Sequence, residues 1–414
     1  MRCRFNLWAT LLITAVLALA PTSIRSQQHG PALPGANQYY APRATLGFEE
    51  RRECVAGSRF WMSADFLLWW MKGQDVPPLV TTGPPTQAIF PGVLGLAGTN
   101  VVLGNDRQNL GAFPGGRFTL GGWMDPRSRV GLEANYLFVG RQSASRTVQS
   151  PGTPPLSIPF FDFNLPGENT TGLASEASFF SGVAQLSYTT RLQGAEANGI
   201  VGLIDRGLIR IDGLIGFRWL NLDESLAFDT SSPSLPPFPP SFFITRDRFE
   251  TRNDFYGGQL GLRTESNIGR FFLLGAAKVA LGSISQTTRI SGALITDSFA
   301  TPGVSQSFPG GYFTAPTNIG EHHRSQFAVV PEVNLSAGVH VRENIRVSAG
   351  YSFLYLSSVA RPGDQIDRSI NASQLPGISG NPLPVLIGPA RPAYLGNDSS
   401  FWAHGLNVGV EVRY

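Results

Sequence analysis

Histidine is the side chain here with the most versatile chemistry near neutral pH, because it can transfer protons and bind metals. His340 falls on an expected strand, on the same face as Glu332, Asn334 and Ser336. A hydrolytic site would need a nucleophile within hydrogen-bond reach of that histidine. Ser336 is four residues away along an alternating strand, which is too far. A solvated or ion-paired His340 is therefore the favoured interpretation.

Two further groups could bind a metal. His322 and His323 are adjacent, so on an extended strand their side chains point in opposite directions and do not share an ion. Asp364 and Asp367 carry the oxygen ligands that calcium prefers, but their spacing does not match an EF-hand loop. Calcium binding stays an alternative to the interpretation that we favour, in which these acids pair with Arg361 and Arg368 and order the base of a loop. We expect no catalytic, cofactor-binding or metal-binding residues.

The elements that would position such residues are strands. From Phe60 onward apolar and polar residues alternate, which is typical of strands with one apolar face. This alternation predicts about ten strands, at Phe60–Trp70, Arg117–Met124, Arg129–Arg141, Phe180–Thr190, Leu208–Asn221, Phe255–Arg263, Phe271–Gly282, Phe327–Arg342, Ile345–Tyr355 and Gly405–Tyr414.

The connections between these strands alternate in length. Short turns are expected at Asp125–Ser128, Thr264–Gly269 and Glu343–Asn344, with a moderate turn at Gln193–Gly207. Five long stretches rich in Pro, Gly, Ser and Thr lie between them, at Met71–Gly116, Gln142–Phe179, Leu222–Asp254, Ser283–Gln326 and Leu356–Phe401. Short periplasmic turns and long extracellular loops are the pattern of outer-membrane barrels. The sequence therefore predicts an all-β fold, an antiparallel transmembrane up-and-down β-barrel of about ten strands, with twelve as the alternative.

Aromatic residues near the strand ends fit the girdles that such barrels place where hydrocarbon meets water. These residues are Trp61, Trp69, Trp70, Trp123, Tyr136, Tyr188, Trp219, Tyr351, Tyr355 and Tyr414. Three of them, Trp61, Trp69 and Trp123, fall on the lumen-facing parity and fit this role less well.

The last ten residues, Gly405–Tyr414, alternate apolar and polar side chains and end on an aromatic residue. One face of this strand would meet lipid and the other the lumen. Its ending resembles the targeting signal read by the outer-membrane assembly machinery, carried here by Asn407, Gly409, Val412 and Tyr414. Outer-membrane lipids, the barrel assembly machinery and periplasmic chaperones are thus the expected partners.

The start of the chain is typical of export. Arg2 and Arg4 precede an apolar run from Leu7 to Ala20 that is too short to anchor in a bilayer, which predicts a secretory signal over residues 1–26. Residues 27–59 are polar and Pro-containing and are expected to form a flexible periplasmic lead-in, followed by a barrel domain over 60–414. Cys54 would be the lone cysteine of the exported chain, which excludes an internal disulfide. No basic block suggests nucleic-acid binding, and the expected localisation is the outer membrane.

The lumen-facing parity of the strands carries charges of both signs in nearly equal number. The predicted lumen-lining residues are Asp65, Arg117, Glu133, Arg210, Asp212, Arg218, Arg263, Lys278, Glu332, Arg346 and Glu411. A ten-stranded barrel is only slightly wider than an eight-stranded one, which side chains fill. Arginine–carboxylate pairs across such a lumen favour a plugged or narrow channel.

Several motifs resemble the planctomycete outer-membrane beta-barrel porin family, the seventh of the families so named. The resemblance covers about Phe60–Tyr414. It rests on Ala64–Trp70, Pro77–Gly83, Gly115–Phe118 with Gly121 and Trp123, Arg252–Gly258, Lys278–Gly282, Gly350–Tyr355, Arg361–Asp367, Trp402 and Gly405. It implies an outer-membrane barrel and a porin-like role, but it implies no substrate and no functional residues. The plugged lumen predicted from the charges is in tension with an open porin.

Three functions remain open from the sequence. The first is a narrow porin-like channel for small solutes. The second is a structural or surface-interaction barrel whose long outer loops carry the function. A barrel enzyme ranks last, because no cluster of nucleophile, base and orienting group is visible, and the oligomeric state is undetermined.

Overall fold

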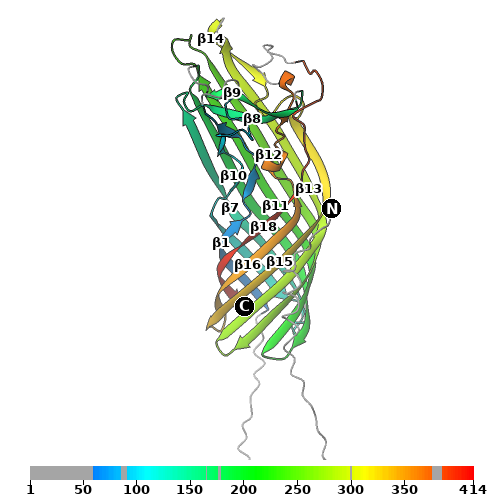
Figure 1. The fold of residues 1–414 in the computed structure, drawn as a ribbon. Coiled ribbons are helices and arrows are strands. Elements are labelled where there is room, and N and C mark those ends of the chain that lie inside the picture. Colours follow the sequence, from blue (N-terminus) through cyan, green and yellow to red (C-terminus); the bar gives the residue numbers. More distant parts are fainter. Residues whose placement is uncertain (1–58, 85–90, 165, 176–178, 299–300, 375–384) are drawn as a thin grey trace, which may run out of the picture. The chain divides into compact units, whose positions relative to one another are not determined.

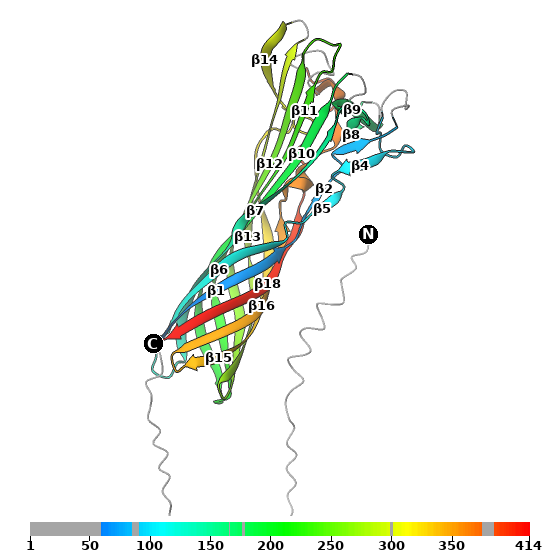
Figure 2. The ribbon, with the colours of Figure 1, turned by 90° about the vertical axis from the view of Figure 1, so that its left-hand side faces the viewer.

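The computed structural model describes residues 59–84, 91–164, 166–175, 179–298, 301–374 and 385–414 (Figures 1 and 2). Ten long strands form its main body. They are β1 (Phe60–Met71), β6 (Ala112–Trp123), β7 (Val130–Ser150), β10 (Gly182–Asp205), β11 (Ile209–Pro233), β12 (Phe242–Ile268), β13 (Phe271–Ser298), β15 (Gly320–Arg342), β16 (Ile345–Val359) and β18 (Ser399–Arg413). Among the described residues, no helix is long and apolar enough to cross a membrane.

The main sheet closes on itself. It runs in the order β12-β11-β10-β7-β6-β1-β18-β16-β15-β13-β14, and β12 also pairs with β13. Strand β14 (Thr301–Pro309) pairs only with β13, so the other ten strands form a closed antiparallel ring. The first and last strands meet along their whole length, from Trp61 opposite Arg413 to Met71 opposite Ala403. The predicted all-β, ten-stranded up-and-down barrel is confirmed, and the alternative of twelve strands is wrong.

The smaller elements gather at the end of the barrel opposite the carboxyl terminus (Figures 1 and 2). They are β2 (Gln74–Val76), β3 (Val80–Thr82), β4 (Asn100–Leu103), β5 (Asp106–Gln108), β8 (Leu156–Asp162), β9 (Gly167–Ser175), η1 (Pro362–Gln365), β17 (Ser369–Ile370) and η2 (Ala372–Gln374). We call this the long-loop end. The other is the short-turn end, where β6, β10, β12 and β15 each turn directly into the next barrel strand.

Local chemistry explains the tightness of these turns. The Asp125 carboxylate accepts the backbone N–H groups of Arg129 and Val130 at 2.6 and 2.8 Å, which closes the β6–β7 turn. Gly207 and Gly269 adopt positive φ angles of 75° and 61° in the next two turns, a conformation that glycine accepts without steric cost. In outer-membrane barrels such turns face the periplasm.

Several barrel strands extend much farther than the sequence predicts. Strand β10 continues to Asp205, so the expected turn at Gln193–Gly207 is wrong. The expected long loop at Leu222–Asp254 is also wrong, because β11 and β12 stay paired up to Pro233 opposite Phe242. Strand β13 likewise runs through the first part of the expected loop at Ser283–Gln326.

The reason is a change of surroundings along one strand. On β11 the outward side chains Ile215 and Phe217 are exposed and apolar, whereas the inward Arg218 is buried. Farther along, the inward Leu226 and Phe228 are completely buried. We call the part with apolar outward side chains, residues 209–219 on β11, the membrane belt, and the part beyond it, residues 221–233, the outer barrel. Lipid surrounds the belt and water surrounds the outer barrel, so the apolar face changes sides.

The predicted signal over residues 1–26 and nearly all of the lead-in over 27–59 lie outside the described residues, so these two boundaries stay predictions.

Candidate functional site

The interior of the barrel is the candidate site, and side chains fill it in layers. Strand β11 passes through every layer, so its inward residues give their order from the short-turn end. They are Arg210 and Asp212, then Leu214, Arg218, Leu220 and Leu222, Glu224, and finally Leu226 and Phe228. Charged and apolar layers therefore alternate along the axis.

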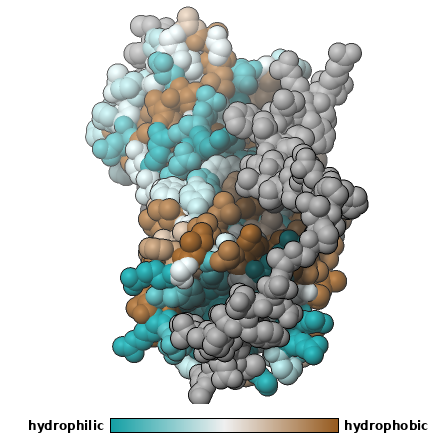
Figure 3. Space-filling view, turned by 90° about the horizontal axis from the view of Figure 1, so that it is seen from below, coloured by the Kyte–Doolittle hydropathy of each residue, from teal (hydrophilic) through white to brown (hydrophobic). Residues whose placement is uncertain are grey.

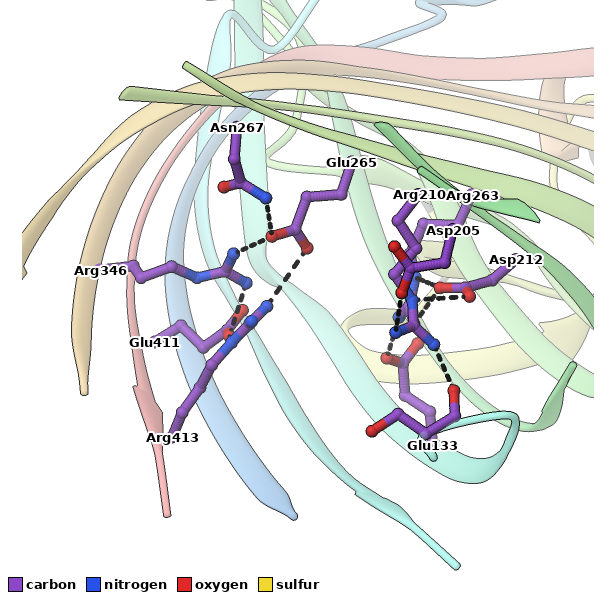
Figure 4. Close-up of polar contacts among 11 residues, drawn as sticks. Glu133, Asp205, Arg210, Asp212, Arg263, Glu265, Asn267, Arg346, Glu411 and Arg413 are labelled. Atoms are coloured by element: carbon purple, nitrogen blue, oxygen red, sulfur yellow. Dashed lines mark hydrogen bonds and ion pairs between the residues drawn. The ribbon is translucent and has the colours of Figure 1, made fainter. Parts of the chain in front are cut away.

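The first layer surrounds a cavity of about 370 Å³ that lies between the short-turn rim and the middle of the belt. Figure 4 shows two groups of ion pairs on its wall. In one, Arg346 donates to Glu265 at 2.7 Å and to Glu411 at 2.6 Å, and Arg413 donates to the other Glu265 oxygen at 3.2 Å. Arg346 and Glu411 lie opposite each other on the paired strands β16 and β18, and Glu265 reaches them from β12, which is separated from β16 by β15 and β13 around the ring.

The second group lies on the opposite side of the cavity (Figure 4). Arg263 donates to Glu133 at 2.8 Å and to Asp212 at 3.0 Å, and Arg210 donates to Asp212 at 2.9 Å. The Arg210 guanidinium also lies over the Trp123 ring, 4.2 Å from its centroid. Charges of the cavity wall thus neutralise one another locally and leave it with no strong preference for one sign of solute.

A second charged layer closes the inner end of this cavity. Arg218 donates to Glu196 through Nε at 3.0 Å and also donates to Glu332. Lys278 donates to Glu196 as well. The side chains of Arg218, Glu196 and Glu332 are 2–3% exposed. Arg117 approaches Glu332 at 3.7 Å from the cavity side. Such a layer spans the lumen, because its members come from β6, β10, β11, β13 and β15.

An apolar layer follows. Its large members Leu67, Trp69 and Phe113 are buried, and they pack with inward residues from every other side of the barrel. The other members are Met71, Val139, Leu192, Leu220, Leu222, Phe255, Ala280, Ile284, Ala328, Val330, Leu354, Leu356, Val359, Phe401 and Ala403. A packed apolar layer excludes water and ions, so it blocks the lumen more completely than the charges below it.

Above the apolar layer, one arginine from the last loop reaches into the outer barrel. Arg361, just before η1, donates to both oxygens of Glu224 at 2.9 and 2.7 Å, and to the backbone oxygens of Gly73 at 2.8 Å and Lys72 at 3.0 Å. It also donates to the Tyr188 hydroxyl at 3.0 Å. The Glu224 carboxylate raises the pKa of Arg361 further above its usual range, against the opposing effect of burial. This arrangement clamps two loops onto the barrel wall.

The expected partners of the loop acids are therefore wrong. Arg361 pairs with Glu224, Asp367 pairs with Arg391 at 2.8 Å, and Arg368 pairs with Glu168 at 2.7 Å. Arg361 joins the last loop to the barrel wall and Arg368 joins it to β9, whereas the pair of Asp367 and Arg391 lies within the last loop.

His340 and His322, both in the described part of the chain, have no nucleophile and orienting carboxylate arranged around them. His340 Nε2 is 3.3 Å from the Asn267 amide oxygen, and its ring packs edge-on against Phe272. His322 stacks on Tyr394 with ring centroids 4.0 Å apart. Within the described part of the chain, no group of three or more His, Cys, Asp or Glu side chains is placed to hold a metal.

The girdle prediction is partly corrected. Of the predicted girdle residues, Tyr136 and Tyr351 are exposed on the outer wall of the belt. Tyr188 was assigned to the girdle but is buried inside the outer barrel, where it donates to Glu224. Trp69 is also internal, because its indole donates to Asn407 at 2.9 Å.

All eleven residues predicted to line the lumen have inward side chains. Asp65, Arg117, Glu133, Arg210, Asp212, Arg263, Lys278, Arg346 and Glu411 line the cavity, and Arg218 and Glu332 lie in the charged layer behind it. Sequence reasoning missed Glu196, because the region was taken for a turn, and missed its partner Gln259. The alternation of Glu196 and Asn198 with small apolar residues was the signal that could have found them.

The closed antiparallel ring with an apolar outer belt defines the class of protein as an outer-membrane β-barrel. A family model described as "Putative beta barrel porin-7 (BBP7)" matches residues 61–414, so the chain belongs to this porin-like family of the outer membrane. The resemblance noted from the motifs is thereby confirmed. A search of curated proteins finds no match.

Solved structures with a similar fold include the outer membrane protease OmpT from Escherichia coli, with 9% identity over 86% of this chain and 97% of that chain and a TM-score of 0.39. Another is a TodX monoaromatic hydrocarbon channel mutant, with 8% identity over 87% of this chain and 91% of that chain and a TM-score of 0.23. A third is a Pseudomonas aeruginosa FadL homologue, with 7% identity over 86% of this chain and 90% of that chain and a TM-score of 0.22. At these TM-scores the likenesses carry no argument about activity.

Proposed function

We propose that this porin-like barrel keeps its lumen closed and acts at the cell surface through its outer barrel and long loops. The observation that carries the proposal is the stack of filled layers. The charged layer of Arg218, Glu196 and Glu332 and the apolar layer around Trp69 lie one above the other in a ten-stranded ring. Wide diffusion pores need many more strands to leave an aqueous channel.

Conductance in a planar bilayer tests this proposal. The folded full-length protein is expected to give no stable current steps, whereas heat-modifiable migration in a detergent gel shows that the same sample is a folded barrel. As a matched variant, Leu220→Gly, Trp69→Gly and Arg218→Ala together remove side-chain bulk from the apolar layer and the charged layer that block the lumen. We expect this variant to conduct. Stable steps from the unchanged protein would overturn the closed-lumen proposal.

A narrow channel is the second candidate, and the cavity open toward the short-turn end favours it. If solutes pass, they must cross the charged layer, so neutralising one of its acids should change ion selectivity. Glu332→Gln is the variant to compare. A current whose cation preference falls in this variant would establish the channel in place of the closed barrel.

Surface action requires the long-loop end to face outward. Val385 is 68% exposed on the last loop, and Gly269 lies in a short turn at the other end. An epitope tag at position 385 is expected to bind antibody on intact cells, and a tag at 269 is not. The reverse labelling would place the loops in the periplasm and overturn the proposed site of action.

We propose that the protein is not an enzyme. Support comes from His340, whose nearest polar partner is a neutral amide and not a nucleophile or an orienting carboxylate. A hydrolytic screen of the folded barrel with peptide and ester substrates is expected to give no turnover, and turnover lost in His340→Ala would contradict this.

Assembly is proposed to follow the outer-membrane route, with residues 1–26 as the signal and the ending Asn407, Gly409, Val412 and Tyr414 as the recognition sequence. Tyr414 exchanges two backbone hydrogen bonds with Phe60, at 2.8 and 3.1 Å, and its side chain is 67% exposed. Deleting Tyr414 therefore removes little packing from the finished barrel. We expect much less protein in the outer-membrane fraction but normal refolding in detergent, and Tyr414→Phe is the control that should assemble normally.

A further inference from the structure

We propose that a ring of six arginines at the short-turn end binds the anionic phospholipid headgroups of the adjacent membrane leaflet. Each of the six residues lies at the end of a barrel strand or within three residues of it. They are Arg59, Arg127, Arg129, Arg206, Arg270 and Arg342.

Their distribution follows the ring of strands. Arg59 precedes β1, Arg127 and Arg129 lie in the β6–β7 connection, and Arg206 lies between β10 and β11. Arg270 follows β12, and Arg342 ends β15. Because strand order around the barrel follows chain order, these positions are spread around the whole circumference. A patch for one compact ligand would instead gather on one side.

The six guanidinium groups differ from most of the described arginines in having no carboxylate partner. Inside the barrel, Arg218 and Arg346 each pair with two glutamates. On the exposed outer barrel, Arg248 and Arg289 also pair with acids, at 2.8 Å. Among the described residues, none of the six rim arginines lies within ion-pair distance of a carboxylate, and all six are exposed. Arg141 and Arg246 are also exposed and have no carboxylate partner among the described residues, but each lies singly on its own strand, whereas the six rim arginines are gathered at one end of the barrel.

The rim is also positive as a whole. Its nearby acids are Asp125, Asp205 and Glu343. The Asp125 carboxylate accepts two backbone N–H groups, and Asp205 approaches the cavity residue Arg210 at 3.8 Å. Six arginines facing these three acids and the terminal carboxylate of Tyr414, whose backbone is hydrogen-bonded to Phe60, leave an excess of two positive charges at this end. An anionic surface is therefore the complementary partner.

Depth identifies that surface as lipid. Each rim arginine is next to, or within three residues of, an exposed apolar side chain of the belt. These side chains include Phe60, Val130, Leu208, Phe271 and Val341, which are 47–68% exposed. Figure 3, seen from below, shows hydrophilic groups along the rim beside a hydrophobic band. An arginine at this boundary extends its stem along the acyl chains and its guanidinium into the headgroup layer.

Guanidinium groups bind phosphate through paired, parallel hydrogen bonds, which gives arginine its affinity for phosphate esters. Positive residues near an anionic lipid surface each favour binding by about fivefold. A ring of independent contacts would thus concentrate anionic lipids around this end of the barrel.

The experiment compares lipid association with the full-length protein in vesicles. Spin-labelled phosphatidylglycerol and phosphatidylcholine are added separately to vesicles of phosphatidylcholine, and the fraction of each label immobilised by the barrel is measured. The unchanged protein should prefer phosphatidylglycerol. Changing all six rim arginines to Gln should abolish that preference, and changing all six to Lys should retain most of it, because lysine keeps the charge.

A control changes two arginines of the outer barrel far from the rim, Arg248 at 34% and Arg289 at 59% side-chain exposure. Arg248→Gln with Arg289→Gln removes charge from the outer barrel and should leave the preference unchanged. Heat-modifiable migration establishes that each variant is folded. The proposal is overturned if the six-Gln variant keeps its preference, if the outer-barrel control loses as much, or if the rim arginines mediate sedimentation with purified peptidoglycan without affecting lipid preference.

Discussion

The membrane belt and the outer barrel are built from the same strands with opposite chemistry. In the belt part of β11, Ile215 and Phe217 face lipid and Arg218 faces inward, where it is buried with carboxylates. In the outer barrel, Asp229 lies on the outer wall and Phe228 is buried inside. One continuous strand thus changes from a membrane protein pattern to a soluble protein pattern without a break.

This difference shows that two environments can share one hydrogen-bonded sheet. Pairing between β11 and β12 runs without a register shift from Ile209 opposite Ser266 to Pro233 opposite Phe242. Backbone hydrogen bonds are indifferent to the surrounding solvent once every group is paired. Only the side chains differ between the two environments. The apolar side chains move from the outer face of a strand to its inner face where the membrane surface crosses that strand.

Removing one carboxylate from each region gives the strongest test of this difference between the belt and the outer barrel. Glu332→Ala leaves Arg218, Lys278 and Arg117 facing Glu196 alone in a buried layer. Breaking a buried ion pair by removing one partner costs about 3–5 kcal/mol. We expect a correspondingly large loss of stability, measured as the denaturant midpoint of unfolding in detergent micelles.

The matched control is Glu321→Ala on the outside of the outer barrel. Glu321 accepts from Arg289 at 2.8 Å, but both side chains are about half exposed. An exposed ion pair of this kind contributes about 0–1 kcal/mol. Equal losses from the two variants would mean that the inner charged layer is as well solvated as the surface pair, and the closed lumen would have to be abandoned.

An arginine introduced on the outer wall tests where the boundary between the membrane belt and the outer barrel lies. Val410 on β18 is 46% exposed and faces lipid, so Val410→Arg should cost about 2–4 kcal/mol near the midplane. Ser285 on β13 also faces outward but lies in the outer barrel, so Ser285→Arg should change stability little. The measurement is the unfolding midpoint of refolded protein in lipid vesicles. If Val410→Arg were tolerated and Ser285→Arg lost stability, the membrane boundary assigned here would be at the wrong level.

The closing strand also shows that the alternation of residues along a strand predicts well which side chains face outward and which face inward. Its alternation assigns Val410 outward and Asn407 inward, as found. Parity does not reveal that Asn407 accepts from Trp69 at 2.9 Å and donates to Ser352 at 2.6 Å. Those partners come from strands far away in the sequence, and only the closed ring brings them together. Asn407→Ser would therefore disrupt a buried network.

Ten barrel strands and their order were predictable from the sequence, because each crosses the belt with one apolar face. Their lengths were not. Beyond the membrane boundary, the apolar residues Leu226 and Phe228 lie on the inner face of the strand. The Ser, Thr and Asp residues on the outer wall there have the composition that is typical of a loop, so the sequence predicts a loop. The same change of parity made Tyr188 look like a girdle residue. The clamp of Arg361 on Glu224 could not be predicted either, because nothing in the sequence relates a loop arginine to an acid 137 positions earlier.

The smallest expected effect concerns the outer barrel alone, at a carboxylate that has no counterpart in the belt. Asp247 on β12 is completely buried and accepts the backbone N–H groups of Tyr312, Phe313 and Thr314 at 3.0, 3.2 and 2.9 Å. These contacts hold the turn after β14 inside the mouth of the outer barrel. Burial raises the pKa of Asp247 to about 6 from an ordinary value of 3.8, against the opposing effect of the hydrogen bonds.

A raised pKa in the folded state means that the folded state binds the proton more tightly than the unfolded state does. The resulting stabilisation is complete below about pH 4 and is lost as the pH rises through about 6. We expect hydrogen exchange at the amides of residues 311–315, corrected for intrinsic rates, to become less protected over this range. Asp247→Asn cannot titrate and should remove the pH dependence, while belt amides on β1 stay equally protected in both proteins. If the variant kept the full pH dependence, another titrating group would be responsible, and the buried Asp247 carboxylate would not explain the behaviour of this turn.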